Sequence, residues 1–177
     1  MKLQPMGDGY VSNIYQIGNK KVYPLMFEVN YGQMQSLNSY LYDNGKQLVL
    51  IDACIHLPAC NEFFDRQLKE YGLSIEQIDF ILLTHHHGDH VGQVNRLLKI
   101  KNIPIYAHYK SIERLTLEES YLEQRRKFFQ KMYNEYGCLD LGKKQLEKLK
   151  HSAENNKDIK ISVPINPLYD GDEIAGL

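Results

Sequence analysis

A cluster of potential metal ligands is the feature that most constrains how this chain folds. Residues 84–90 read Thr-His-His-His-Gly-Asp-His and directly follow the apolar run Phe-Ile-Leu-Leu at 80–83, which predicts a buried strand. Side chains two residues apart share one face of a strand, so we expect His85, His87 and Asp89 to point the same way. His90 follows where the chain leaves the strand. Imidazole and carboxylate together suit zinc or iron, so the segment predicts a metal site at a strand end.

Two ordinary explanations compete with a metal site. Consecutive histidines also occur in solvated loops and in purification tags. A tag lies at a chain terminus and lacks the Asp89-His90 continuation, whereas this segment is internal and follows an apolar run. Thr84, the ligands, Gly92 and the preceding strand occur together, and this combination favours metal binding.

The pattern Thr-His-x-His-x-Asp-His after a hydrophobic strand resembles the metal motif of the metallo-β-lactamase-fold hydrolases. Residues 48–52 (Leu-Val-Leu-Ile-Asp) resemble the first motif of that family, a strand that ends in Asp, and residues 37–41 resemble the strand before it. Residues 169–174 (Tyr-Asp-Gly-Asp-Glu-Ile) resemble the turn before the family's third metal motif. The resemblance implies an α+β fold, an αββα sandwich of two similar halves, with the metal site along one edge between them.

The resemblance also implies a role for each ligand. His85 and His87 are expected to bind a first metal ion, and Asp89 and His90 a second. Zinc is expected in both places, with iron or manganese as alternatives. Asp89 is the expected catalytic residue, because it would orient a metal-bound hydroxide and accept its proton.

Neighbouring residues are expected to support the ligands instead of binding metal. Asp52 and Thr84 are the candidates for contacts to the ligating imidazoles, because carboxylates commonly anchor such rings. The ordinary alternative for Asp52 is a cap or turn at its strand end. His86 occupies the variable position of the motif and is expected to point away from the metal. Cys54 and His56 follow the first motif, where we expect a buried thiol and a loop histidine.

The function implied by the resemblance is hydrolysis. A metal-bound hydroxide would attack a small ester, thioester, lactone or lactam, so a small-molecule substrate is expected. Two alternatives remain open: a mono-iron sulfur dioxygenase with a similar motif, and a non-catalytic metal-binding half-domain. The sequence does not name the substrate.

The third metal motif of the family has no equivalent in these residues. A His-containing turn would be expected after the Asp-Gly-Asp turn at 170–172, and the sequence given ends at Leu177. We therefore expect residues 1–177 to be an incomplete, N-terminal portion of such a domain, with one face of its sheet bare and weak zinc binding on its own. A homodimer that supplies the missing sheet is a second possibility.

The rest of the chain predicts a mixed sheet with outer helices. Asp43-Asn44-Gly45-Lys46 is a strong hairpin-turn signal, because Asn and Gly tolerate positive φ. Helices are predicted at residues 58–71, with Gly72 at the C-terminal cap, and at 91–99. Strands are predicted at residues 10–17, 22–29, 36–42, 47–52, 79–83 and 103–107.

Residues 109–157 are predicted to form a charged helical insert within this domain, with 11 Lys and Arg against 8 Asp and Glu. We expect two helices, broken near Gly137 or at Leu141-Gly142. They are either a solvated helical pair or a lid over the active site. The aromatic residues of the insert either pack the pair or line an apolar pocket. The basic run Arg125-Arg126-Lys127 is a weaker candidate for holding an anionic substrate group.

The net charge and the distribution of apolar residues limit the kinds of partner that this chain is expected to have. The net charge is −1 and the pI about 6.6, so no general attraction to nucleic acid is expected. No apolar run approaches the roughly 20 residues that span a bilayer, so no membrane contact is expected. The odd number of cysteines, Cys54, Cys60 and Cys138, suggests free thiols, and the N-terminal residues lack an apolar signal core. Together these features predict a cytoplasmic protein.

Overall fold

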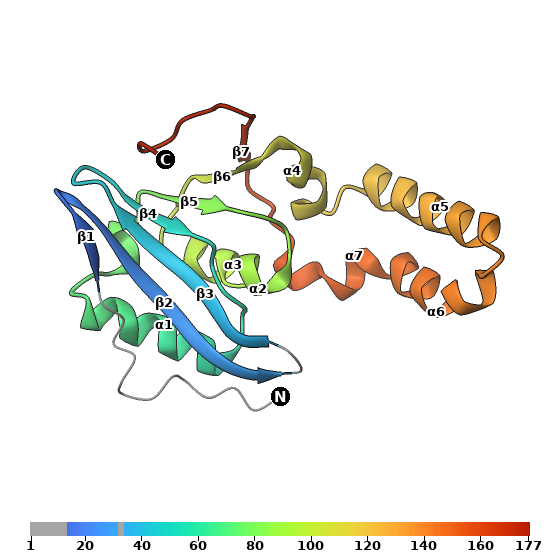
Figure 1. Cartoon of the computed structure of the whole chain (residues 1–177), viewed down its shortest axis with the longest axis horizontal. Coiled ribbons are helices and arrows are strands. Elements are labelled where there is room, and N and C mark those ends of the chain that lie inside the picture. Colours follow the sequence, from blue (N-terminus) through green and yellow to red (C-terminus); the bar gives the residue numbers. More distant parts are fainter. Residues whose placement is uncertain (1–13, 32–33) are drawn as a thin grey trace.

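One mixed sheet of seven strands organises the computed structural model, which describes residues 14–31 and 34–177 (Figure 1). The strands lie in sequence order across the sheet. The first four pair antiparallel, and the fourth to the seventh pair parallel. This confirms the mixed sheet of the predicted α+β fold. The strands are β1 (Tyr15–Ile17), β2 (Lys20–Tyr31), β3 (Met34–Asp43), β4 (Leu48–Ile51), β5 (Phe80–Leu83), β6 (Ile105–His108) and β7 (Ile165–Leu168).

The strand predictions differ from the structure mainly at their ends. Residues 10–13 of the predicted strand 10–17 lie outside the described residues, and residues 15–17 form β1. The turn at 43–46 is confirmed: Asn44 Oδ1 accepts hydrogen bonds from the backbone N–H groups of Lys46 and Gln47, and Gly45 has a φ of +84°. Strand β7 was not predicted, because Asn166 and Pro167 interrupt its apolar pattern.

Helices cover one face of the sheet. They are α1 (Pro58–Glu70), the short 3-10 helix η2 (Ile75–Gln77), α2 (Gly88–Val91) and α3 (Val94–Leu98). Helix α1 starts and ends as predicted to within one residue, and Gly72 follows it with a φ of +69°. Apolar side chains from α1, α3 and alternate positions of the strands form the largest core cluster. Its fully buried members include Leu41, Leu50, Ile81, Leu97 and Ile105.

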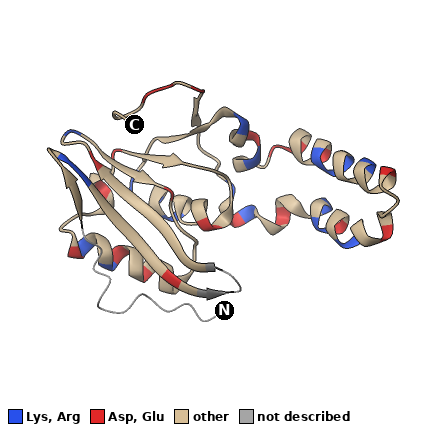
Figure 2. Ribbon diagram, viewed as in Figure 1, with Lys and Arg blue, Asp and Glu red and all other residues tan. Residues whose placement is uncertain are grey.

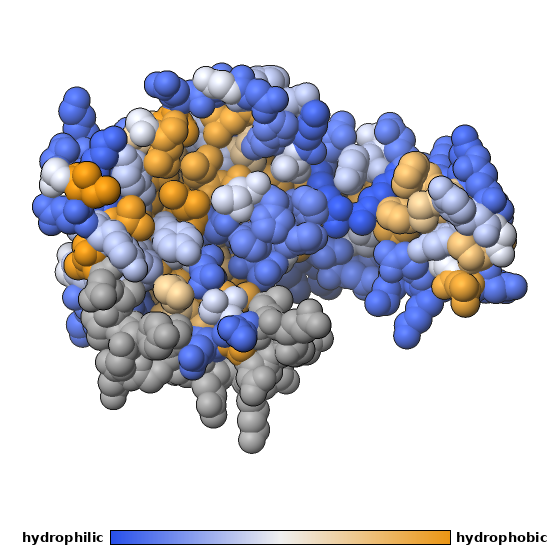
Figure 3. Space-filling model, in the orientation of Figure 1, coloured by the Kyte–Doolittle hydropathy of each residue, from blue (hydrophilic) through white to orange (hydrophobic). Residues whose placement is uncertain are grey.

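The opposite face of the sheet carries a second apolar cluster, over which the described residues place no helix. Tyr42, Val49 and Phe80 are buried there, and partly buried side chains surround them. Figure 3 shows apolar side chains gathered over the sheet on the face turned to the viewer. Among the described residues, the cover on this side comes from the segment around Ile174 and Ala175. In the described part of the chain, helices therefore lie over one face of the sheet, and the segment around Ile174 and Ala175 covers part of the other.

The predicted helix 91–99 is wrong in its start and its continuity. The structure has α2 from Gly88 and a separate α3, with Gly92 and Gln93 between them. The chain is held there by the loop after β4: Ala53 N–H donates to His90 O (2.6 Å), and Gln93 N–H donates to Ala53 O (3.2 Å). These two bonds fix the metal motif against the loop that carries Asp52.

Gly92 allows that close approach. A Cβ at this position would lie 2.5 Å from His56 N and 2.8 Å from Ile55 Cα, both backbone atoms that cannot move independently. We therefore expect Gly92→Ala to lower the free energy of unfolding by about 1–3 kcal/mol, since overpacking displaces backbone. Urea denaturation measures this. Gly88→Ala is the matched control, because its Cβ would meet only Ile159 Cδ1, at 3.8 Å. A Gly92→Ala protein as stable as the control would contradict the argument.

The helical insert contains four helices instead of the predicted two. They are α4 (Tyr109–Leu115), α5 (Glu119–Glu135), α6 (Leu139–Lys150) and α7 (Ser152–Asn155), followed by the 3-10 helix η3 (Lys157–Ile159). The break at Gly137 is confirmed, with a φ of +62°, whereas Leu141-Gly142 lies inside α6. An additional break occurs at Leu117, whose φ is +52°. Hydrophobic periodicity does not reveal a positive φ at leucine.

Helices α5 and α6 form an antiparallel hairpin that extends away from the sheet (Figure 1). Charges of both signs are interspersed along it (Figure 2), and several are paired within one helix. Phe128 and Tyr136 are 62% and 78% exposed, so these two aromatic residues do not line an apolar pocket. In the described part of the chain, no helix is long and apolar enough to cross a membrane.

Candidate metal centre

The metal motif and the first motif meet because β4 and β5 are parallel neighbours. Both strands end at the same edge of the sheet, where Ile51 pairs with Leu82. Beyond this pair, the Asp52 N–H donates to Leu82 O at 3.0 Å. The chain then turns sharply, with a φ of +58° at Asp52, a conformation that Asp tolerates better than most residues. This turn places the Asp52 carboxylate beside the first residues of the metal motif.

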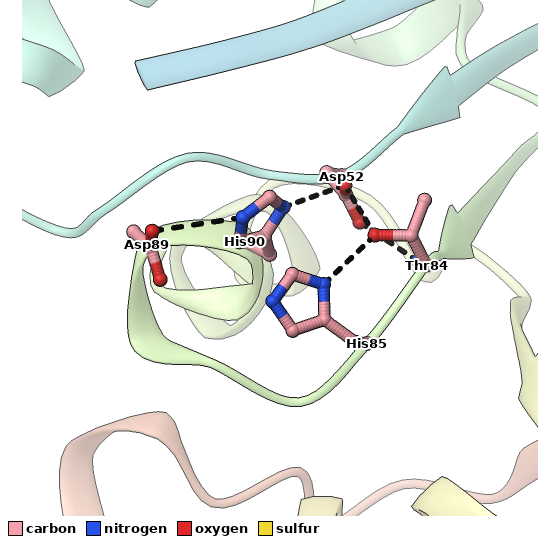
Figure 4. A network of polar contacts seen from close by, with 5 residues as sticks. All are labelled: Asp52, Thr84, His85, Asp89 and His90. Atoms are coloured by element: carbon pink, nitrogen blue, oxygen red, sulfur yellow. Dashed lines mark hydrogen bonds and ion pairs between the residues drawn. The ribbon is translucent and has the colours of Figure 1, made fainter. Parts of the chain in front are cut away.

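Asp52 is the buried anchor of the site (Figure 4), with only 5% of its surface exposed. Its Oδ1 accepts a hydrogen bond from Thr84 N–H at 2.9 Å. Its Oδ2 accepts a hydrogen bond from Thr84 Oγ1 and lies 2.7 Å from His90 Nδ1. The carboxylate therefore fixes the His90 ring and selects the tautomer with the proton on Nδ1. Both residues proposed to support the ligands, Asp52 and Thr84, are in contact with motif imidazoles.

Three imidazoles of the motif lie beside one another. The ring centroid of His85 lies 3.9 Å from that of His90 and 4.8 Å from that of His87. Thr84 Oγ1 contacts His85 Nδ1 at 3.1 Å, and His90 Nε2 lies 3.6 Å from Asp89 Oδ2. Figure 4 shows the remaining ring nitrogens of His85 and His90 on the side where the Asp89 carboxylate lies.

The donor set fits a metal ion of the expected kind. His85 and His90 each have a polar partner at Nδ1, so Nε2 is the nitrogen of each ring that would bind an ion, which is the usual arrangement around ligating histidines. Burial, followed by the nearby charges of His90 and His87, lowers the pKa of His85, which keeps that ring neutral and able to bind. In the described part of the chain, no three His, Cys, Asp or Glu side chains lie close enough together to enclose one ion.

Other cysteine and histidine residues make separate contacts. Cys54 and Cys60 are buried free thiols in mutual contact, and a hydrogen bond from Cys60 lowers the pKa of Cys54. His56 contacts Asn61 Oδ1 at 3.2 Å. His108 lies near Asp170, 3.6 Å from Nε2 to Oδ1. None of these side chains joins the imidazoles of the motif in the described structure.

Comparison with known proteins agrees with this geometry. Residues 35–176 match the family model of the metallo-beta-lactamase superfamily. The chain belongs to this superfamily. The match covers the strand before the first motif, both motifs described above and the helical insert. Members of this superfamily are mostly hydrolases, and their fold commonly carries zinc.

Individual relatives of this metallo-β-lactamase-superfamily chain are distant. It is 29% identical over 109 residues to the probable metallo-hydrolase YybB of Bacillus subtilis (strain 168), covering 62% of this chain and 46% of that protein. Among solved structures, a metallo-beta-lactamase family protein of Thermus thermophilus matches with a TM-score of 0.61 at 22% identity, over 88% of this chain and 48% of that one. The hydrolase AbOPH matches with a TM-score of 0.56 at 22% identity, over 91% and 62%.

These comparisons fix the fold and the superfamily. The chain spans about half the length, or less, of the curated relatives it matches. The structural matches, below 25% identity, show the fold alone.

The sequence did not indicate that His86 and Arg114 lie near each other beside the site. His86, expected to point away from the metal, is not a solvated side chain: its Nε2 atom is buried and has no hydrogen-bond partner in the described structure. Burial, reinforced by the charge of Arg114, lowers the pKa of His86 to about 4. Arg114 was not singled out because it is one of many charges in the insert, and nothing in its spacing indicates where α4 places it.

Proposed function

We propose that the protein is a metal-dependent hydrolase that uses two zinc ions to cleave a small ester, thioester, lactone or lactam. His85 and His87 hold one ion, and Asp89 and His90 the other. When bound, zinc lowers the pKa of a coordinated water molecule to about 7 and polarises the substrate carbonyl. Asp89 would orient that water molecule and would hold its proton on the carboxylate.

The observation that carries this proposal is the anchoring of His90 by Asp52. A buried carboxylate 2.7 Å from Nδ1 orients the ring and increases the basicity of Nε2. A histidine used only for packing has no need of a buried acidic partner. Membership of a superfamily of mostly hydrolases supports the reaction type.

Zinc titration of the metal-free chain tests the metal site. We expect calorimetry to detect binding, and we expect imidazole NMR signals of His85, His87 and His90 to shift while those of His56, His108 and His151 stay constant. The constant set consists of histidines outside the cluster, so it serves as an internal control. Zinc binding that shifts the control histidines, or no binding at millimolar zinc, would overturn the proposed site.

Hydrolysis tests the reaction. Cleavage of a p-nitrophenyl ester or a thioester by the zinc-loaded chain should stop on addition of a chelator and return when zinc is restored. Oxygen consumption that requires iron, with no zinc-dependent hydrolysis, would instead support the sulfur dioxygenase. Zinc binding without either activity would support the non-catalytic alternative.

A further inference from the structure

A small cavity separates the metal motif from the helical insert. Its volume is about 80 Å³. A cavity needs roughly 10–15 Å³ to hold one water molecule, so this cavity has room for several water molecules or one small oxyanion. The motif contributes one wall, and the insert closes the others through α4, α5 and the residues around α7. The cavity is lined by His86, His87, Gly88, Arg114, Leu117, Leu122, Arg125, Ser152, Asn156 and Ile159.

Two arginines of this lining lack an acidic partner in the described part of the chain. Among the ion pairs formed by the described residues, none includes Arg114 or Arg125. The Arg114 side chain contacts Tyr121, and Arg125 lies over the Phe129 ring, 5.6 Å from its centroid. Burial, together with the charge of Arg125, lowers the pKa of Arg114. Two guanidinium groups therefore approach one cavity to which the described residues contribute no carboxylate.

The two basic residues that follow Arg125 in the sequence pair with a carboxylate. Arg126 forms a bidentate pair with Glu123, with Nε 2.9 Å from Oε2 and Nη2 2.7 Å from Oε1. Lys127 Nζ lies 3.4 Å from the same carboxylate. Of the basic run 125–127, only Arg125 lines the cavity. The basic residues that line the cavity are therefore Arg125 from this run and Arg114 from the preceding helix, α4.

His86 adds a hydrogen-bonding group to the same lining. Its Nε2 is buried without a hydrogen-bond partner in the described part of the chain, and an unpaired buried polar atom is unfavourable. An oxyanion in the cavity would balance the charges of the two arginines and lie beside the His86 ring. Guanidinium groups are well suited to carboxylate and phosphate oxygens.

We propose that this cavity is an anion subsite, in which Arg114 and Arg125 hold a carboxylate or phosphate group of the substrate beside the His86 ring. The inference rests on the proposed function in one respect: His87, a proposed zinc ligand, lines the same cavity, so the anchored group would lie next to the reaction centre. The substrate would then be an anionic ester or thioester. The helical insert would serve substrate recognition, and the small volume of the cavity favours a small molecule.

Anion binding by the metal-free chain tests the subsite independently of hydrolysis. Inorganic phosphate and acetate are titrated separately in the presence of a chelator and followed by calorimetry and by the NMR signals of the arginine Nε–H groups. We expect saturable binding of at least one of them, and the tighter one identifies the group. Arg114→Gln and Arg125→Gln should each weaken it about tenfold or more, because each removes charge-assisted hydrogen bonds.

Arg126→Gln is the matched control, since Arg126 is the adjacent residue but pairs with Glu123 and does not line this cavity. It should bind the anion as the unmodified chain does. Thermal unfolding confirms that each variant is folded. Equal weakening by Arg126→Gln, or no saturable binding of either anion, would overturn the subsite.

Hydrolysis then distinguishes failure of the subsite from failure of the proposed function. For a matched pair of p-nitrophenyl esters, one neutral and one with a terminal carboxylate, Arg125→Gln should reduce kcat/KM about tenfold for the anionic ester only. Equal loss on both esters would contradict the subsite while leaving the hydrolase intact. Anion binding with no zinc-dependent hydrolysis of either ester would support the subsite and contradict the proposed reaction.

Discussion

Replacement of His87 by Ala is expected to weaken zinc binding by about 100-fold or more and to remove zinc-dependent hydrolysis, without loss of stability. The side chain of His87 is exposed at the N-terminus of α2 and forms no side-chain cap of that helix. Its backbone carbonyl accepts hydrogen bonds from the N–H groups of His90 and Val91. An Ala at this position keeps those bonds, so the expected defect is confined to the metal.

Calorimetric zinc titration and thermal unfolding of the metal-free protein measure the two quantities. His151→Ala is the control, because His151 is also exposed and its imidazole contacts only Glu147 in the described structure, 3.3 Å from Nε2 to Oε1. The control should bind zinc with unchanged affinity. If His87→Ala retained the zinc affinity of the control, His87 would be excluded as a ligand, and the first metal position would have to be assigned to other residues.

The sheet was predictable because its signals are local. Runs such as residues 80–83 are apolar and short, and the turn at 43–46 carries Asn and Gly where positive φ is needed. The pairing of β4 with β5 then brings two strand ends together, so the contact between Asp52 and Thr84 followed from the order of the motifs. Residues far apart in the chain became neighbours through a strand pair that the structure shows, between two strands that the sequence predicts.

The helical insert was less predictable, since its breaks do not depend on apolar periodicity. Leu117 has a φ of +52°, and no local rule assigns that conformation to a leucine. Whether the metal motif continues into one helix or two depends on a tertiary contact, the hydrogen bond from Gln93 N–H to Ala53 O. The position of Arg114 near His86 depends in turn on where α4 ends, which is why the sequence offered no signal for the cavity.

Replacement of Asp52 is expected to damage both the fold and the metal site. Asp52→Ala removes the acceptor of three polar contacts: Thr84 N–H, Thr84 Oγ1 and His90 Nδ1. It also puts Ala into a conformation with positive φ, which Ala adopts less readily than Asp. We expect the free energy of unfolding to fall by about 3 kcal/mol, measured by urea denaturation, because buried polar groups lose their partner. Zinc affinity should fall roughly 10- to 100-fold.

Asp52→Asn separates these two effects. Asn tolerates positive φ and keeps one oxygen to accept from Thr84 N–H, so most of the stability should remain. Its amide N–H₂ would face His90 Nδ1, and that nitrogen then accepts instead of donating. The proton moves to Nε2, the atom proposed to bind zinc, so zinc affinity should fall about as far as in Asp52→Ala.

Asp79 supplies the control for this tautomer argument, because its carboxylate also accepts a hydrogen bond from the backbone but lies away from the histidines. Asp79 Oδ2 accepts a hydrogen bond from Leu48 N–H at 2.7 Å, at the opposite end of the same two strands. Asp79→Asn should therefore reduce stability somewhat and leave zinc affinity unchanged. Imidazole NMR reports the outcome directly, because the protonated nitrogen of His90 should change from Nδ1 to Nε2 in Asp52→Asn only. Unchanged zinc affinity in Asp52→Asn would mean that His90 does not bind zinc through Nε2.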